Sequence, residues 1–159
     1  MVWAAIHLGG RSDLIIMERD PDAPRNGYTA NSYIKALSEG LLPIYFGDRE
    51  FQQDNAPIHG KWTVDEFFME KGIVVIDWPP HSPDINPIEH VWKALKEELK
   101  KLDTNLYELK KNEASIDWMK KQLIIAWNSL PQDKIDRLIE SLPRRLDAVI
   151  KAKGWYTKY

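Results

Sequence analysis

The sequence lacks cysteine, long apolar runs and an excess of positive charge. Without cysteine it can form neither disulfides nor thiolate metal sites. No apolar run approaches the roughly 18 residues that a membrane helix needs, and the first residues, MVWAAIHLGG, have neither the charged start nor the length of a signal peptide. A formal net charge of -2 gives no overall basic footprint for nucleic acid. We therefore expect no membrane association, and DNA contact only through a local basic surface.

What the sequence does contain is typical of a globular protein. Its 159 residues are 43% hydrophobic and include seven tryptophans, enough to bury a core, and the length predicts a single domain over residues 1–159. Residues 141–159 are locally basic, with five Lys or Arg against one acid, Asp147. The basic residues are Arg144, Arg145, Lys151, Lys153 and Lys158. A solvated helical face explains such a cluster more often than DNA contact does, so both interpretations stay open.

Hydrophobic periodicity predicts an α/β fold with a helical C-terminal region. Two β-prone runs, residues 2–8 and 13–18, flank a turn-forming group and predict a hairpin. Helical patterns then alternate with extended runs, which predicts parallel crossovers and a mixed sheet with helices packed on it. The expected helices span 30–46, 60–72 with Gly72 as the stop, 87–102, and 115–152 with breaks at Pro131 and Pro143, and the expected strands are 50–53 and 73–78.

Asp54 lies in the stretch FQQDNAPIH, directly after one of these strands. The carboxyl ends of strands are where α/β sheets tend to place their reactive groups. Asp-Asn before Ala-Pro is also ordinary turn chemistry, in which Asp and Asn bond the local backbone and Pro57 fixes φ. The spacing alone favours a turn residue over a metal ligand and leaves both alternatives open.

Glu89 lies at the start of the predicted helix 87–102, in the stretch WPPHSPDINPIEHVW. Asn86 has the form of an N-cap, Pro87 takes the first helical position and Glu89 the third, from which it can reach back as a capping box. A carboxylate in this first turn also suits a metal ligand. Two separated carboxylates are the minimum of a site in which hard divalent cations activate water for phosphodiester cleavage. Helix capping and metal binding are therefore the alternatives for Glu89.

Three stretches together resemble the catalytic domain of the mariner superfamily of cut-and-paste DNA transposases, in its Tc-like branch. They are QDNAPIH, WPPHSPDINPIEHVW and LPRRLDAVIKAKGWYTKY, and MVWAAI resembles a further strand of that branch, with Ala4 in place of Gly. Residues 55–88, a gap of 34, separate Asp54 from Glu89 as in that branch. The resemblance covers nearly the whole chain. It implies an RNase H-like fold in which Asp54 and Glu89 are the second and third catalytic, metal-binding acids.

The resemblance also implies cofactors and partners. The complete active site of the family holds two Mg²⁺ or Mn²⁺ ions on three carboxylates. Its substrates are transposon-end DNA and a TA target, its location is nuclear, and a homodimer is one expected assembly of the full-length enzyme. The motif residues expected to support the site are Asn55, His59, Asp84, Asn86 and Pro87. Of these, His59 is also open to a purely structural role and Asp84 is expected to shape the helix entry. The candidates for DNA contact are Arg144, Arg145, Lys151 and Lys153.

Parts of the family pattern have no counterpart in the sequence. The first catalytic Asp belongs to a strand upstream of the one that MVWAAI resembles, and the N-terminal helix-turn-helix domains are not matched either. None of the earlier acids has a matching context: Asp13, Asp20, Asp22 and Asp48. We therefore expect an N-terminally truncated fragment that lacks the first strand and is inactive alone. The alternative is a non-catalytic DNA-binding or protein-interaction module. The specific SPDINPIE string disfavours an unrelated RNase H-like nuclease.

Overall fold

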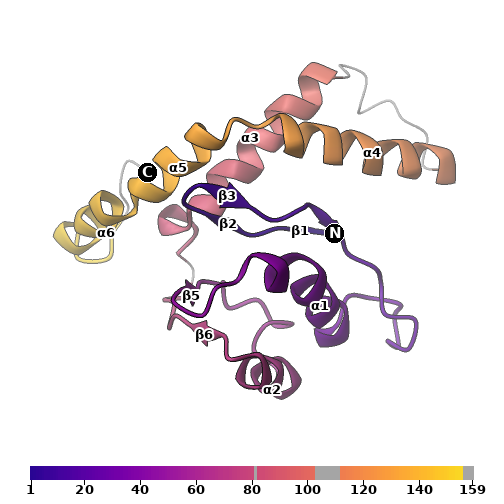
Figure 1. Ribbon diagram of the computed structural model, residues 1–159, viewed down its shortest axis with the longest axis horizontal. Coiled ribbons are helices and arrows are strands. Elements are labelled where there is room, and N and C mark those ends of the chain that lie inside the picture. The colour runs from indigo at the N-terminus through magenta and orange to yellow at the C-terminus, as the bar shows by residue number, and fades with distance from the viewer. Residues whose placement is uncertain (81, 103–111, 156–159) are drawn as a thin grey trace. The chain divides into compact units, whose positions relative to one another are not determined.

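The structure is a computed structural model that describes residues 1–80, 82–102 and 112–155. Along the chain, four short strands come first, helices and strands then alternate, and the described elements after β6 (Val74–Val75) are helical (Figure 1). The chain divides into two compact units: unit 1 comprises Met1–Ala5 and Arg11–Ser82, and unit 2 comprises Ile6–Gly10 and Pro83–Tyr159. Single-domain organisation over residues 1–159 stays a prediction. Within the described ranges, no helix has the length and apolar character needed to cross a bilayer.

The predicted N-terminal hairpin is confirmed, although its ladder is interrupted. Its strands form two short pairs: β1 (Val2–Trp3) with β4 (Ile15–Ile16), and β2 (Ile6–His7) with β3 (Gly10–Arg11). Between the pairs, the Ala5 N–H donates to the Ser12 hydroxyl at 2.8 Å, while the Ser12 N–H donates to the Ala5 carbonyl at 2.9 Å. A side-chain oxygen here takes a role that a backbone carbonyl plays in a regular ladder. The predicted strands 2–8 and 13–18 are accordingly each split in two.

The predicted helix 30–46 is found, but its regular α-helical part is short. Its segments are α1 (Ala30–Ala36), a π-helical turn η1 (Leu37–Leu41) and a 3₁₀ turn η2 (Leu42–Ile44). Pro43 lies within η2, and because it has no N–H to donate, the helix does not continue. In η1, a Cβ at Gly40 would lie 2.4 Å from the Trp3 ring and 3.0 Å from Ile15. The β1–β4 pair therefore packs closely against η1 at a glycine.

Unit 1 continues with a parallel crossover, as the sequence predicted. Its elements are β5 (Glu50–Phe51), α2 (Trp62–Lys71) and β6 (Val74–Val75). β5 and β6 pair in parallel with Phe51 opposite Val75, and the Ile76 N–H donates to the Phe51 carbonyl at 2.9 Å. Helix α2 ends at Gly72, whose φ of 64° is the left-handed C-cap that the sequence indicated. The parallel pairing sets the direction in which the chain leaves β5.

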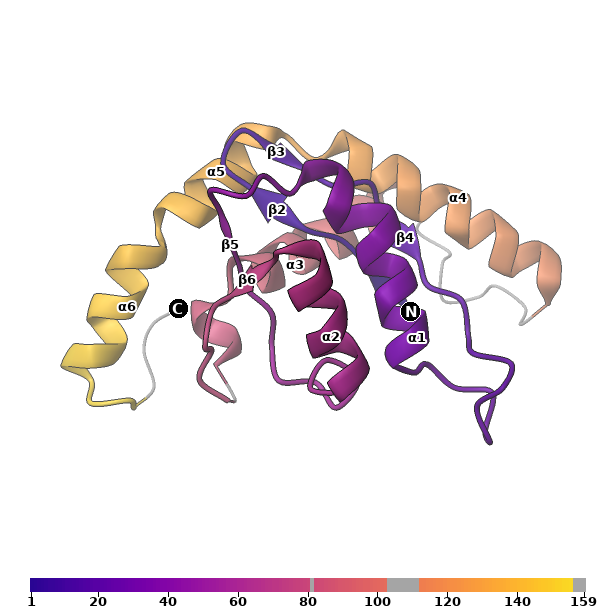
Figure 2. The same ribbon diagram turned by 60° about the horizontal axis from the view of Figure 1, so that its bottom comes forward.

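One apolar core holds unit 1 together. Its buried members come from the hairpin, α1, η1, α2 and the start of β6: Ala5, Met17, Tyr33, Ala36, Leu37, Leu41, Val64, Phe67, Phe68 and Ile73. Helices α1 and α2 lie side by side over it in both views (Figures 1 and 2). Burial of apolar surface is the dominant stabilising term in folding. The core therefore fixes the strand ends of unit 1 and also Tyr33, which is only 1% exposed.

The described part of unit 2 beyond residue 82 is mainly helical. Its elements are the 3₁₀ turn η3 (Pro83–Ile85) and the helices α3 (Pro87–Leu102), α4 (Glu113–Ser129), α5 (Gln132–Glu140) and α6 (Leu142–Lys151). Helix α3 packs against α4 and α5, and the rings of Trp92 and Trp127 lie 5.6 Å apart. The predicted break at Pro131 is confirmed. The predicted break at Pro143 is found at Ser141, and Pro143 lies in the first turn of α6, where the missing N–H of proline is no loss.

The tip of the hairpin belongs to unit 2 because α5 holds it. The Asp136 carboxylate accepts the Gly9 N–H at 2.9 Å and the Gln132 side-chain amide at 3.0 Å, and the same amide donates to the Gly10 carbonyl at 3.2 Å. These hydrogen bonds, first from Gln132 and then from Gly9, lower the pKa of the Asp136 carboxyl. The Asp136 carboxylate thus joins the tip of the hairpin to α5, which lies far from it in the sequence.

The mixed sheet that the sequence predicted is present only in pieces. Among the described residues, the strand pairs are β1 with β4, β2 with β3, and β5 with β6, and each strand is two residues long. Antiparallel and parallel pairings both occur, as expected for a mixed α/β fold. One continuous sheet was the wrong expectation for these residues, since local side-chain bonds such as that of Ser12 interrupt the ladders.

Replacing Gly40 by alanine tests the packing of the hairpin on η1. Gly40→Ala puts a methyl group against the Trp3 ring and Ile15, so we expect the free energy of unfolding to fall by about 1–3 kcal/mol, the usual cost of overpacking. Urea denaturation followed by tryptophan fluorescence measures this loss. Gly47→Ala is the control, because a Cβ there meets nothing within 4 Å. An equal loss in both variants would contradict close packing at Gly40.

Candidate active site

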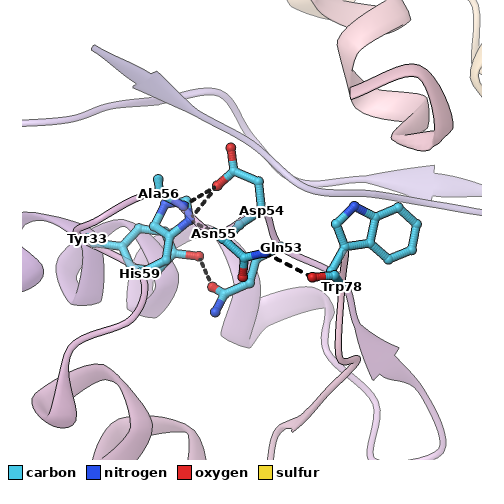
Figure 3. A network of polar contacts seen from close by, with 7 residues as sticks. All are labelled: Tyr33, Gln53, Asp54, Asn55, Ala56, His59 and Trp78. Carbon is cyan, nitrogen blue, oxygen red and sulfur yellow. Dashed lines mark hydrogen bonds and ion pairs between the residues drawn. The ribbon is translucent and has the colours of Figure 1, made fainter. Parts of the chain in front are cut away.

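Asp54 lies in the loop that follows β5, and one oxygen of its carboxylate is held in place (Figure 3). Oδ1 accepts the Ala56 N–H at 3.1 Å and lies 2.7 Å from Nδ1 of His59. The contact with Ala56 is an Asx turn, the local turn chemistry that the sequence indicated. Within the described part of the chain Oδ2 has no hydrogen-bond partner, and Figure 3 shows it directed away from the network. The Asp54 side chain is 59% exposed, so this oxygen is open to solvent.

His59 orients the Asp54 carboxylate. Its Nδ1 lies 2.7 Å from Oδ1 and 3.1 Å from the backbone carbonyl oxygen of Asp54. Both of these oxygens accept hydrogen bonds, so Nδ1 carries a proton and donates it. The His59 N–H donates to the Ala56 carbonyl at 2.8 Å, and the imidazole stacks on the Tyr33 ring with 4.1 Å between centroids. These contacts give His59, whose role the sequence left open, a place in the support of Asp54.

Tyr33 is a site residue that the sequence did not single out. In addition to the stack on His59, its hydroxyl donates to the side-chain oxygen of Gln53 at 2.7 Å (Figure 3). Burial raises the pKa of the Tyr33 phenol well above its usual value, and the nearby charge of Asp54 adds to the rise. The hydroxyl is therefore a neutral donor. The sequence placed Tyr33 only within the predicted helix 30–46, because nothing in a sequence shows which loop a buried ring will touch.

Asn55 links the loops that follow the two parallel strands. Its side-chain amide donates to the Trp78 carbonyl at 2.9 Å, beyond the end of β6. The bond continues the association of β5 with β6 past the last ladder position (Figure 3). Asn55 thus fixes the backbone next to Asp54 and leaves the Asp54 side chain free to reach solvent. The supporting role in catalysis that the motif suggests for Asn55 stays a prediction.

Glu89 is the third residue of α3, and its side chain is exposed. Its N–H donates to the Asn86 carbonyl at 3.2 Å, which puts Asn86 at the N-cap position before Pro87. The capping box that the sequence offered as an alternative is not formed. The Asn86 N–H instead donates to the Pro83 carbonyl at 3.1 Å and closes η3. No residue that the structure describes bonds the Glu89 carboxylate, so both of its oxygens can serve as ligands.

Arg145 holds the turn that precedes Glu89. It is 4% exposed, and its guanidinium donates through Nη1 to the Asp84 carbonyl at 3.1 Å and through Nε to the Ser141 hydroxyl at 2.8 Å. Nη1 also contacts Nε2 of His90. Because arginine can only donate, Nε2 accepts and carries no proton. Burial, followed by the charges of Arg145 and Lys93, lowers the pKa of His90, which agrees with a neutral ring.

The described basic residues near the C-terminus fall into two groups, and Lys158 lies outside the described residues. Arg144, Lys151 and Lys153 are exposed, as DNA contact requires. Arg145 is buried and bonded to η3, so its environment favours support of the turn over the DNA contact that we expected of it. Asp84 accepts this bond through its backbone carbonyl, and the role in helix entry that we expected of it stays a prediction.

The carboxylates that could hold a metal lie in different units. Asp54 belongs to unit 1 and Glu89 to unit 2. Oxygen ligands of this kind suit Mg²⁺ and Mn²⁺, and the open oxygens of both residues fit such ions. In the described ranges, no three His, Asp or Glu side chains gather into a ready-made metal site.

Asp20, one of the earlier acids without a matching motif, has local partners. Its carboxylate accepts the Asp22 N–H at 3.0 Å and the Thr29 hydroxyl at 2.5 Å.

Comparison with known sequences identifies relatives of the chain. Residues 23–111 match a family described as DDE superfamily endonuclease. The chain is 41% identical over 109 residues to the Transposable element Tc1 transposase of Caenorhabditis elegans, covering 69% of this chain and 37% of that protein. It is 35% identical over 118 residues to the Transposable element Tc3 transposase of the same species, covering 74% and 34%. The chain thus spans about a third of the length of these curated relatives.

Solved structures of low sequence identity share the fold. The Mos1 transposase catalytic domain, solved with Raltegravir and Mg, matches with a TM-score of 0.67 and 17% identity over 99% of this chain and 83% of that one. The same domain solved with Raltegravir and Mn matches with a TM-score of 0.65 and 19% identity over 99% and 82%. At such identity the likeness concerns the fold alone, and it confirms the mixed α/β, RNase H-like class.

The neighbouring arginines of α6 provide a matched test of the buried network. Arg145→Ala removes charged hydrogen bonds to Asp84 and Ser141, each of which contributes about 1.5–3 kcal/mol. We expect a loss of at least about 2 kcal/mol in the free energy of unfolding, measured by urea denaturation. Arg144→Ala removes the same charge from an exposed position and should change stability by less than about 0.5 kcal/mol. Equal losses would contradict a special role for Arg145.

Proposed function

The chain belongs to the Tc1/mariner family of DDE transposases, and we propose that its 159 residues form part of a catalytic domain for metal-dependent cleavage and joining of DNA. One observation carries the proposal: the Asp54 carboxylate is anchored through one oxygen and presents the other to solvent. A residue needed only for the turn would require the anchored oxygen alone. The second motif carboxylate, Glu89, supports the proposal because it is exposed and takes no part in capping its helix.

Asp54 and Glu89 are, in this proposal, two of the carboxylates that bind divalent cations. Mg²⁺ or Mn²⁺ on these oxygens would activate a water for attack at phosphorus and stabilise the leaving oxygen. Asp54 contributes Oδ2, while His59 and the Ala56 N–H keep Oδ1 from rotating into its place. Glu89 contributes its carboxylate from the first turn of α3, whose entry is held by the Arg145 bond to the Asp84 carbonyl.

The substrate in this proposal is DNA, first a phosphodiester at a transposon end and then a TA target. Both reactions are in-line displacements at phosphorus, in which positioning of the reacting groups supplies most of the catalysis. The family motifs supply two of the three expected carboxylates within these 159 residues. We therefore propose that a protein of these residues alone binds divalent cations weakly and does not cleave DNA.

A second candidate is a module that binds DNA without cutting it. The exposed side chains of Arg144, Lys151 and Lys153, on and just after α6, favour this function because phosphate contacts need accessible cations. The two candidates differ in their dependence on metal and on Asp54. Binding through basic residues depends on salt concentration and is indifferent to chelators.

Isosteric amides test the ligand role of the two carboxylates. Asp54→Asn and Glu89→Gln remove the charge and keep the size, so we expect each to weaken Mn²⁺ binding by the 159-residue protein about 10-fold or more. Electron paramagnetic resonance of free Mn²⁺ during a titration measures the affinity. Asp48→Asn and Glu97→Gln are matched controls, because both acids are exposed in the same unit or helix as the residue they control for.

Two outcomes would contradict the catalytic proposal. Equal Mn²⁺ affinities for Asp54→Asn and Asp48→Asn would show that the motif carboxylate is not a ligand. Mg²⁺-dependent nicking of transposon-end DNA by the 159-residue protein, lost in Asp54→Asn, would show that two carboxylates suffice. The first outcome would contradict metal binding by Asp54. The second would contradict only the expectation that the 159-residue protein is inactive.

The salt dependence of DNA binding tests the basic surface of α6. Arg144→Ala combined with Lys151→Ala should reduce the slope of log K against log salt by about 2, since each phosphate contact contributes about 0.9. Fluorescence anisotropy with labelled duplex DNA measures it. The control combines Lys96→Ala with Lys134→Ala, which removes the same charge from exposed positions on other helices of unit 2. If both pairs reduce the slope equally, α6 is not the contact surface.

A further inference from the structure

Tyr33 contacts the residues on both sides of Asp54 in the chain. Its ring stacks on the imidazole of His59, with 4.1 Å between centroids and 28° between planes. Its hydroxyl donates to the side chain of Gln53, the residue directly before Asp54, at 2.7 Å. His59 in turn reaches the Asp54 carboxylate, and Figure 3 shows these side chains as one connected network. Tyr33 itself comes from α1, a different element from the loop that it touches.

We propose that Tyr33 is a positioning residue for Asp54, acting through His59 and Gln53. This inference rests on the proposed function, because it assigns Tyr33 to the same carboxylate. Among the described residues, no hydrogen bond joins Tyr33 to Asp54 directly. Tyr33 fixes the backbone before Asp54 through Gln53 and the carboxylate after it through the stacked imidazole, so that Oδ2 keeps one direction.

The burial of Tyr33 makes this support rigid. Tyr33 is 1% exposed within the core of unit 1, whereas the side chain of Asp54 is 59% exposed. An exposed carboxylate on a loop rotates readily, and ordering it costs conformational entropy. Because the core already fixes the Tyr33 ring, the carboxylate of Asp54 is ordered when the protein folds. The entropy of ordering it is then lost before a ligand binds. Outer residues that orient a ligand side chain commonly change metal affinity 10–100-fold when they are replaced.

A purely structural tyrosine would behave differently, and Tyr45 provides the comparison. The Tyr45 hydroxyl donates to the Arg49 carbonyl at 2.7 Å and accepts the Val74 N–H at 3.0 Å. Its hydroxyl therefore supports the backbone beside β5 and β6 and bonds neither Gln53 nor His59. Tyr45→Phe and Tyr33→Phe each remove one bonded hydroxyl from unit 1, and both should lower stability. Only Tyr33→Phe removes a bond next to Asp54.

The experiment compares wild type, Tyr33→Phe, Tyr33→Leu and Tyr45→Phe with two readouts. Three-bond NMR couplings in metal-free protein report whether the Asp54 and His59 side chains keep one rotamer, and Mn²⁺ titration reports affinity. We expect one rotamer in wild type and Tyr45→Phe, and averaging in Tyr33→Leu, which loses both the stack and the hydroxyl. Mn²⁺ binding should weaken about 10-fold in Tyr33→Leu and by a smaller factor in Tyr33→Phe.

The two readouts separate this inference from the proposed function. Unchanged Asp54 and His59 rotamers in the Tyr33 variants overturn the positioning role, whether or not metal binds. If Tyr33→Leu does not fold, Tyr33→Phe decides alone, because it keeps the ring and removes the hydroxyl that bonds Gln53. An equal effect of Tyr45→Phe on the Asp54 rotamer also overturns the inference. A further outcome is that the Asp54 rotamer averages in the Tyr33 variants while Asp54→Asn binds Mn²⁺ as tightly as wild type. That result would support positioning by Tyr33 and contradict the proposed metal role of Asp54.

Discussion

The parallel pairing of β5 with β6 is the constraint on which the Asp54 site depends. Two ladder positions and the Ile76 bond to Phe51 fix the direction of both strands, and the Asn55 bond to the Trp78 carbonyl extends the pairing beyond them. Because parallel strands end at the same edge, the loops that follow them leave the pair together. The Asp54 backbone is therefore fixed by unit 1 itself, and the remaining freedom lies in its side chain.

The Asp54 side chain resolves two interpretations that look exclusive in the sequence. As a turn residue it needs one oxygen for the Ala56 N–H, and as a metal ligand it needs one oxygen directed outward. In the structure Oδ1 takes the turn contact and Oδ2 is directed outward, so the turn does not compete with the proposed ligand role. The turn then assists the proposed ligand role, because a carboxylate held at one oxygen presents the other in a defined direction. His59 strengthens the effect by donating to the held oxygen.

Local patterns in the sequence predicted the parts of the fold that local physics decides. The apolar periodicity and the Asn-Pro start placed α3 at residues 87–102, and Gly72 marked the end of α2 correctly. The interruption of the hairpin by the Ser12 hydroxyl was not predictable, because it depends on which backbone groups face each other. The same limit applies to the support of Asp54 by Tyr33. The sequence predicted that Tyr33 lies in a helix, but the partner of a buried ring is decided by tertiary packing.

The two arginines of α6 show why a basic cluster cannot be interpreted from charge alone. Adjacent residues on a helix point about 100° apart, so Arg144 faces solvent while Arg145 enters the interior of unit 2. The Arg145 guanidinium has bonding partners in several directions, among them the Asp84 carbonyl and the Ser141 hydroxyl. A planar fork with five donors suits such a site, whereas the point charge of lysine does not. The turn before Glu89 therefore depends on Arg145, a residue of α6. Its neighbour Arg144 has the same charge but lies on the surface.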